Sequence, residues 1–291
     1  MLEYNPKDWL TFIFRFHKSD TIRQLLPMII LIAIYAAGIA YLEITYWKLS
    51  ETSHLKNITL MHGILSFVIS MLLVFRTNTA YDRWWEGRKL WGSLVNNSRN
   101  LAIKLSAYLP KEDAENRLFF KKIIPAYAYA LKNHLSHEST RTELFDDELL
   151  NKKIQHDKHV PNQVALMIIK RVEKLYQEKK ITNEHLIVLN SELQSLTDVC
   201  GACERIKNTP IPYSYSAFIK KFIFFYVMTL PFGYVFSLGY YVIPVVCFIF
   251  YVLASLELIA EEIEDPFGGD SNDLPTTKIA ANIHKHVYEI L

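Results

Sequence analysis

The stretch ITLMHGILSFVISMLLVF at residues 58–75, followed at once by RTNTAYDRWWEGRKLW at residues 76–91, decides the fold of this chain. Its first part contains no Asp, Glu, Lys or Arg, and at about 1.5 Å of rise per helical residue it nearly crosses a hydrocarbon layer of about 30 Å. Its second part carries arginines and tryptophans, which are typical of a helix that leaves a membrane on the cytoplasmic side. The sequence therefore predicts one long helix that begins in lipid and ends in the cytosol.

Two faces of this predicted helix differ in chemistry. A sector of small and hydroxylated residues consists of Thr59, Gly63, Ser66 and Ser70. Such residues let membrane helices approach closely, so this sector predicts a helix-packing face. Phe67, Met71 and Phe75 form a neighbouring apolar stripe at every fourth position. Periodicity leaves two interpretations of the stripe: contact with lipid or another helix, or, if several copies surround an axis, a constriction that gates by dewetting.

Three motifs in order resemble those of bestrophin-family ion channels in their bacterial form. They are FRTNTAYDRWWEGRKLWG at residues 75–92, CERIKNTPIPYSY at residues 203–215 and EEIEDPFGGDSNDLP at residues 261–275. The resemblance implies a homopentameric ion channel of a bacterial inner membrane, with the long helix lining a narrow neck. On that basis Phe67, Met71 and Phe75 become the expected neck residues.

The first motif also holds residues that we expect to be structural rather than ion-selective. They are Arg76, Arg83, Glu86, Arg88 and Trp91. An arginine at the cytosolic exit of a helix can pair with carboxylates such as Glu86 or those of residues 261–265. Breaking such a partly buried pair leaves an uncompensated charge.

The remaining hydropathy pattern predicts an all-α polytopic membrane protein. Apolar stretches at residues 25–47, 58–75, 222–238 and 241–260 give four transmembrane helices, and the distribution of Lys and Arg places both termini in the cytosol. Between the second and third stretches no window is apolar enough to cross lipid, and apolar residues recur at helical spacing. Thr182 or Asn183 is the predicted N-cap of one of these cytosolic helices.

The predicted organisation follows from these boundaries. Residues 1–23 form a cytosolic or interfacial segment, 24–91 the first transmembrane pair with the pore-lining helix, 92–216 a large cytosolic helical domain, 217–260 the second transmembrane pair, and 261–291 an acidic cytosolic C-terminal segment.

The acidic loop offers hard oxygen ligands of the kind that Ca²⁺ takes, namely Glu262, Asp265, Asp270 and Asp273. By resemblance these positions match a calcium clasp of eukaryotic bestrophins, although carboxylates here replace side-chain amides. By the same resemblance, bacterial members of the family are expected to open without calcium. The alternative is an acidic loop that caps helices and pairs with arginines of a neighbouring subunit.

Cysteine and histidine positions give weaker signals. Cys200 and Cys203 form one CxxC, and a structural zinc site needs two more ligands, for which His134 or His185 are the candidates. A packed pair of buried thiols is the favoured interpretation. His62 lies within the long helix, where it is expected to bond a neighbouring helix.

Glu184 decides the predicted ion preference. Counting back from CERIKNTPIP, it falls where the resemblance places a cytosolic aperture that is usually apolar. Five carboxylates in a ring concentrate cations and repel anions. The resemblance itself divides, since eukaryotic members look like anion channels and bacterial members like cation channels. The bacterial form of the motifs leads us to expect monovalent cations such as Na⁺ to pass. The alternatives are a solvent-exposed acid in a first helical turn, a chloride or other anion channel of the same family, or a non-conducting membrane scaffold.

Two classes of function are not expected from this sequence. The small net charge of +2 argues against a nucleic-acid partner, and the absence of catalytic motifs argues against an enzyme.

Overall fold

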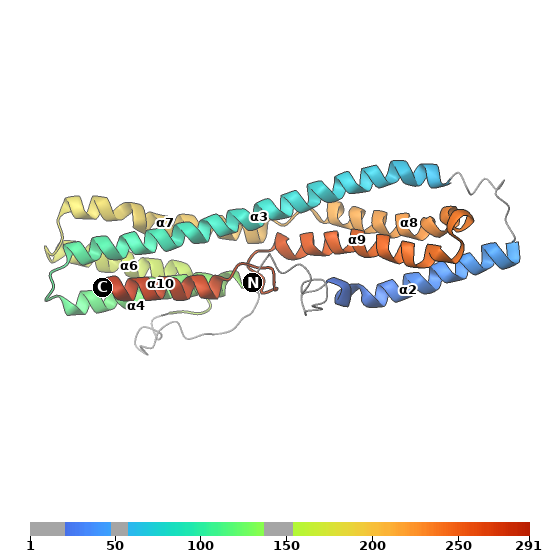
Figure 1. The fold of residues 1–291 in the computed structure, drawn as a ribbon. Coiled ribbons are helices and arrows are strands. Elements are labelled where there is room, and N and C mark those ends of the chain that lie inside the picture. The colour runs from blue at the N-terminus through green and yellow to red at the C-terminus, as the bar shows by residue number, and fades with distance from the viewer. Residues whose placement is uncertain (1–20, 48–57, 137–153) are drawn as a thin grey trace. The chain divides into compact units, whose positions relative to one another are not determined.

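The computed structural model describes residues 21–47, 58–136 and 154–291, and these residues are helical with no strands. In chain order the elements are α2 (Thr21–Tyr41), the π-helix η1 (Leu42–Trp47), α3 (Ile58–Tyr108), α4 (Ala114–Leu135), α6 (Val160–Gln177), α7 (Asn183–Asn208), α8 (Tyr213–Leu238), the 3₁₀ turn η3 (Gly239–Tyr241), α9 (Val242–Glu264) and α10 (Thr276–Ile290) (Figure 1). The predicted all-α class is confirmed for this part of the chain. The N-terminal segment predicted at residues 1–23 lies almost entirely outside it.

The chain divides into two compact units. The polar unit comprises Arg83–Pro210 and Asp265–Leu291, and the apolar unit comprises the described residues of Leu2–Asp82 together with Ile211–Glu264. Helix α3 supplies residues to both units, because the division falls within it.

The apolar unit contains the helices that are suited to a membrane. Among the described residues, three stretches are long and apolar enough to cross one, namely Thr21–Trp47, Ile58–Tyr108 and Tyr213–Glu264. The last stretch holds α8 and α9, which pack against each other and against α2. Side chains such as Ile32, Ile69, Val227 and Phe250 form the shared core. The chain is therefore a membrane protein, whereas a count of four crossings stays a prediction.

The polar unit is a bundle of α4, α6, α7, α10 and the later part of α3. In it α4 packs against α6 and α10, and α6 packs against α7 (Figure 1). The predicted N-cap of α7 is confirmed: Thr182 Oγ1 accepts from the His185 amide, and His185 Nδ1 accepts from the Thr182 amide. This reciprocal capping box satisfies donors that a helix start otherwise leaves unpaired.

One buried stripe follows α3 through both units. Its members recur at alternating spacings of three and four residues and include His62, Ile69, Leu73, Arg76, Ala80, Gly87, Trp91, Leu94, Ser98, Leu101 and Leu105. Positions three and four apart lie on one face of a helix, so the spacing alone accounts for the stripe. Of its polar members, His62 bonds another helix, since its Nε2 lies 2.9 Å from Thr229 Oγ1 of α8, whereas the buried hydroxyl of Ser98 has no hydrogen-bond partner among the described residues.

The small residues that were predicted to form a helix-packing face are not members of this buried stripe. Gly63 and Ser70 are exposed, and nothing described lies within 4 Å of where a Cβ on Gly63 would sit. Ser66 and Ser70 donate to carbonyls of their own helix. Thr59 donates to the carbonyl of Gly233 of α8, and the side chain of Ser66 hydrogen-bonds that of Tyr226, also of α8. Two members of the sector thus contact another helix of the same chain and two do not, so the packing face stays a prediction. The larger apolar side chains of the buried stripe supply most of the core.

Arg76 is the most buried cation of the apolar unit, with its side chain 1% exposed. Its Nη2 lies 2.8 Å from Oε2 of Glu264, and its Nε donates to Oε1 of Glu257 at 3.4 Å. Glu264 also accepts from the amide of Ile211, which precedes α8. Arginine suits this place because its planar guanidinium can engage two carboxylates at once. The pair of carboxylates on α9 thereby fixes α9 to α3 inside the apolar unit.

We expect Arg76→Gln to destabilise the protein, because Glu257 and Glu264 would keep buried charges with no cation to compensate them. A broken buried pair costs about 3–5 kcal/mol, so the midpoint of thermal unfolding in detergent should fall clearly. Arg88→Gln is the matched control, since Arg88 lies exposed on the same helix. Equal midpoints for the two variants would contradict this role of Arg76.

Candidate functional site

The predicted neck residues lie on the exposed side of α3 in the apolar unit. Phe67, Met71 and Phe75 are 70%, 49% and 53% exposed, and Ile69 and Leu73 of the buried stripe lie between them in sequence. Further large apolar side chains of the same segment are exposed as well, namely Leu60, Met61, Ile64, Val68 and Val74. A contiguous apolar surface of this extent marks contact with lipid or with another protein chain. A single chain thus leaves the predicted neck uncovered.

Within the polar unit, three further residues of the first motif make contacts, whereas Arg88 is exposed. Arg83 donates from Nη1 to the carbonyl of Thr209 at 2.5 Å and from Nη2 to the carbonyl of Ile206 at 2.6 Å. These are carbonyls at the end of α7, where a cation is favoured by the helix dipole. Glu86 pairs with Arg205 at 2.7 Å, and Trp91 is fully buried. Their predicted structural role stays a prediction, and these contacts agree with it.

The acidic loop packs closely on α3 at Gly87. A Cβ on Gly87 would lie 3.2 Å from side-chain atoms of Pro266, Phe267 and Leu274. Trp84, one turn earlier on α3, donates from Nε1 to the carbonyl of Asn272 at 3.0 Å. Gly87 therefore allows the acidic loop to approach α3 closely, and the hydrogen bond of Trp84 fixes the position of the loop along that helix.

Asp273 is the structural centre of this loop. Its Oδ2 accepts from the amides of Gly269 and Asp270 at 2.5 and 2.6 Å, and the side chain is almost fully buried. Its Oδ1 is also buried and has no hydrogen-bond partner among the described residues. Burial raises the pKa of Asp273 to about 6, with smaller contributions from the charges of Asp270 and Asp265, although the two amide bonds lower it.

These carboxylates fit a hard cation only in part. Asp265, Asp270 and Asp273 lie in one loop with an orphaned, buried oxygen, which is the chemistry that Ca²⁺ satisfies. Their ligand atoms nevertheless do not form one of the described groups that lie within 4.8 Å of one another. Glu262 belongs to the apolar unit, where its Oε1 accepts from Gln24, so the predicted fourth ligand is placed separately.

Glu184 lies in the first turn of α7 with its side chain exposed. A hydrogen bond from the side chain of Thr182 is the largest cause that lowers the pKa of Glu184, and its own backbone amide adds to the effect. The carboxylate is therefore ionised at neutral pH. Both the aperture role and the exposed first-turn acid are consistent with this placement.

The CxxC cysteines are buried free thiols in the core of the polar unit. Burial is the main reason that the pKa of each rises to about 12. A protonated thiol is a poor metal ligand, so this arrangement favours the packed pair over a zinc site.

Sequence reasoning missed a cluster of His134, His159 and Glu204, which the polar unit brings together. Glu204 follows His159 by 45 residues and His134 by 70 residues, so no motif spacing connects them. His134 was considered only as a possible zinc ligand beside Cys200 and Cys203, and nothing in the sequence pointed to His159 or Glu204.

Comparison with known proteins identifies the family. The family model described as bacterial/fungal bestrophin protein matches residues 1–289. A relative from Nostoc sp., named as a voltage-dependent anion channel-forming protein, is 38% identical over 232 residues, which cover 78% of this chain and 76% of the relative. A relative of the same name from Synechocystis sp. is 31% identical over 293 residues, covering 99% and 93% of the two chains.

Solved structures point to the same family as the sequence relatives. The crystal structure of a bacterial bestrophin homologue from Klebsiella pneumoniae aligns with a TM-score of 0.83 at 26% identity, covering 91% of this chain and 98% of that one. A point variant of that homologue gives a TM-score of 0.82, covering 92% and 98%. The resemblance seen in the three motifs is thereby confirmed: this chain belongs to the bacterial/fungal bestrophin family and is a bestrophin-family ion channel.

Proposed function

We propose that five copies of the chain surround one axial pore in a bacterial inner membrane and that ions pass through it passively, with both termini in the cytosol. The observation that carries this proposal is the exposed stripe of Phe67, Met71 and Phe75, opposite a buried stripe on the same helix. Five copies of α3 facing an axis give the stripe a partner surface that one chain lacks. The alternative of a non-conducting scaffold predicts no current from purified protein in synthetic bilayers.

The neck controls conduction through its wetting. An apolar ring offers no polar atoms to replace the water shell of an ion, so ions pass only when the ring is wide enough to hold water. Small changes in the width of such a ring then open or close the pore. Helix α3 sets this width, because its buried stripe fixes which face points away from the chain.

The conducted ions are monovalent anions such as chloride in this proposal, which replaces the sequence-based expectation of Na⁺. The relatives from Nostoc and Synechocystis carry the name of anion channels, and this supports the choice. The exposed stripe itself bears no formal charge that would exclude anions. Phe67 and Phe75 are also compatible with anions, since the edge of an aromatic ring carries partial positive charge.

A cation channel is the second candidate, and the ionised, exposed carboxylate of Glu184 favours it. If the five copies of α7 begin near the pore axis, five carboxylates form a ring that attracts cations and repels anions. The two candidates differ only in where Glu184 lies relative to the ion path.

We expect the triple variant Phe67→Ala, Met71→Ala, Phe75→Ala to raise current several-fold at equal protein density in planar bilayers. Smaller side chains widen the ring and keep it wet. Phe248→Ala is the matched control, because it removes an exposed phenyl group from α9 instead. If the triple variant conducts like wild type, the stripe faces lipid or a neighbouring helix and the proposed neck is wrong.

Reversal potentials in a gradient of NaCl separate the two ion assignments. The proposed anion channel gives a wild-type potential near that of chloride, and Glu184→Gln leaves it unchanged. Glu112→Gln, another exposed carboxylate of the polar unit, serves as the control. A wild-type potential near that of Na⁺ that shifts toward chloride in Glu184→Gln would overturn the anion assignment and place Glu184 at the aperture.

We also propose that the acidic loop binds Ca²⁺ through Asp265, Asp270 and Asp273. A bound cation would compensate the orphaned Oδ1 of Asp273, so calcium should raise the thermal unfolding midpoint of wild-type protein but not of Asp273→Asn. Asp157→Asn, an exposed carboxylate outside the loop, should behave like wild type. No calcium-dependent shift in wild type would leave the loop with its alternative role, helix capping and pairing with arginine.

A further inference from the structure

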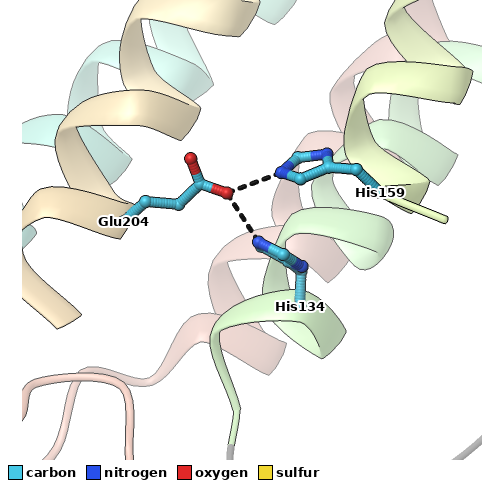
Figure 2. A group of neighbouring side chains, drawn as sticks. All are labelled: His134, His159 and Glu204. Carbon is cyan, nitrogen blue, oxygen red and sulfur yellow. Dashed lines mark hydrogen bonds and ion pairs between the residues drawn. The ribbon is translucent and has the colours of Figure 1, made fainter. Parts of the chain in front are cut away.

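Three side chains from three neighbouring segments converge within the polar unit (Figure 2). His134 lies in the last turn of α4, His159 is the N-cap of α6, and Glu204 belongs to α7. Nε2 of His134 is 2.6 Å and Nε2 of His159 is 2.5 Å from the same carboxylate oxygen, Oε1 of Glu204. Both imidazole nitrogens therefore contact the same carboxylate oxygen, and the three ligand atoms lie within 4.8 Å of one another.

The backbone positions of the cluster are held by packed elements. Glu204 follows Cys203, which is fully buried in the core, and Lys207 of α7 donates from Nζ to the carbonyl of His134 at 3.1 Å. The latter bond ties the end of α7 to the end of α4. Ligands carried by such fixed elements need little reorganisation to bind.

The cluster is partly desolvated and still open to water. The side chains of His134 and His159 are each 32% exposed, and that of Glu204 is 29% exposed, so an ion can enter from solvent. Burial alone would raise the pKa of Glu204, but hydrogen bonds from His159 and His134 outweigh it and hold the pKa below its ordinary value. The carboxylate is ionised at neutral pH and available to a cation.

The donor set indicates the class of ligand. Two imidazoles and one carboxylate are the protein ligands of zinc sites that keep a fourth position open, whereas Ca²⁺ and Mg²⁺ prefer oxygen ligands throughout. We propose that His134, His159 and Glu204 bind a single divalent transition-metal ion of the zinc class, with water in the fourth position.

Binding requires a small movement. Zinc bonds of about 2.0–2.2 Å in tetrahedral geometry place ligand atoms roughly 3.3 Å apart, so Oε1 of Glu204 must withdraw by less than about 1 Å from each nitrogen. The flexible side chain of Glu204 can make this change without moving α7. Without a metal ion, Oε1 of Glu204 instead accepts hydrogen bonds directly from the two imidazoles.

Binding also changes the tautomer of His159. Its Nδ1 accepts from the amide of Asn162 at 3.2 Å, so in the metal-free neutral ring Nε2 carries the proton that is donated to Glu204. Coordination through Nε2 moves that proton to Nδ1 and gives up this N-cap bond. The loss of one N-cap hydrogen bond is small beside the free energy of zinc binding.

The test uses tag-free, full-length protein in detergent, equilibrated in a metal buffer with Zn²⁺ or Co²⁺. Bound Zn²⁺ should amount to one ion per chain, and bound Co²⁺ should give the intense visible bands of a tetrahedral site without a thiolate charge-transfer band. Removal of an outer-shell partner already costs about 10–100-fold in metal affinity, so loss of a ligand should cost at least as much. His134→Gln and Glu204→Gln should each show it.

Three further variants separate loss of a metal ligand from loss of folding and from metal binding at other residues. His159→Asn keeps an N-cap acceptor while removing the imidazole, so it should fold like wild type and lose the metal. His284→Ala removes an exposed imidazole of α10, and Cys200→Ser with Cys203→Ser removes the buried thiols, and both should bind metal like wild type. Absence of stoichiometric metal in wild type, or full binding by a folded His159→Asn variant, would overturn the proposal.

Discussion

The structure depends on the continuous burial of one stripe along α3. Within a single 51-residue helix, residues three and four apart supply the core of the apolar unit and then the core of the polar unit. This periodicity turns Phe67, Met71 and Phe75 outward and Arg76 inward, where two carboxylates of α9 meet it. The hydrophobic effect orients the helix, and the buried ion pair fixes the neighbouring α9 against it.

Features with a local cause could be predicted from the sequence. Residues 58–91 predicted a long helix because the apolar run passes without Pro or a turn into a charged run, and α3 contains all of them. Thr182 or Asn183 was predicted as an N-cap because a short polar side chain before an acidic first turn satisfies unpaired amides, and the structure shows that Thr182 has this role. Family membership followed from three long motifs, which carry far more information than periodicity.

Features that depend on distant residues could not be predicted in this way. Small residues predicted a packing side of α3, and two of them, Thr59 and Ser66, bond α8. The sequence of α3 does not say that large apolar side chains of α8 and α9 meet the neighbouring stripe as well. The cluster of His134, His159 and Glu204 arises only when α4, α6 and α7 pack, and Asp273 is buried only because the acidic loop lies on Gly87. The proposed ion preference turns on whether Glu184 lies along the ion path, which depends on how several chains assemble.

The central claim is that the outward stripe of α3 is covered by copies of itself around an axis. Native mass spectrometry of the purified protein, released from detergent under gentle conditions, measures this directly against the chain mass of 34.0 kDa. The account predicts a single dominant species whose mass is that of five chains. A dominant monomer, under conditions in which a bestrophin homologue measured alongside stays assembled, would contradict it, because no axial pore could then form.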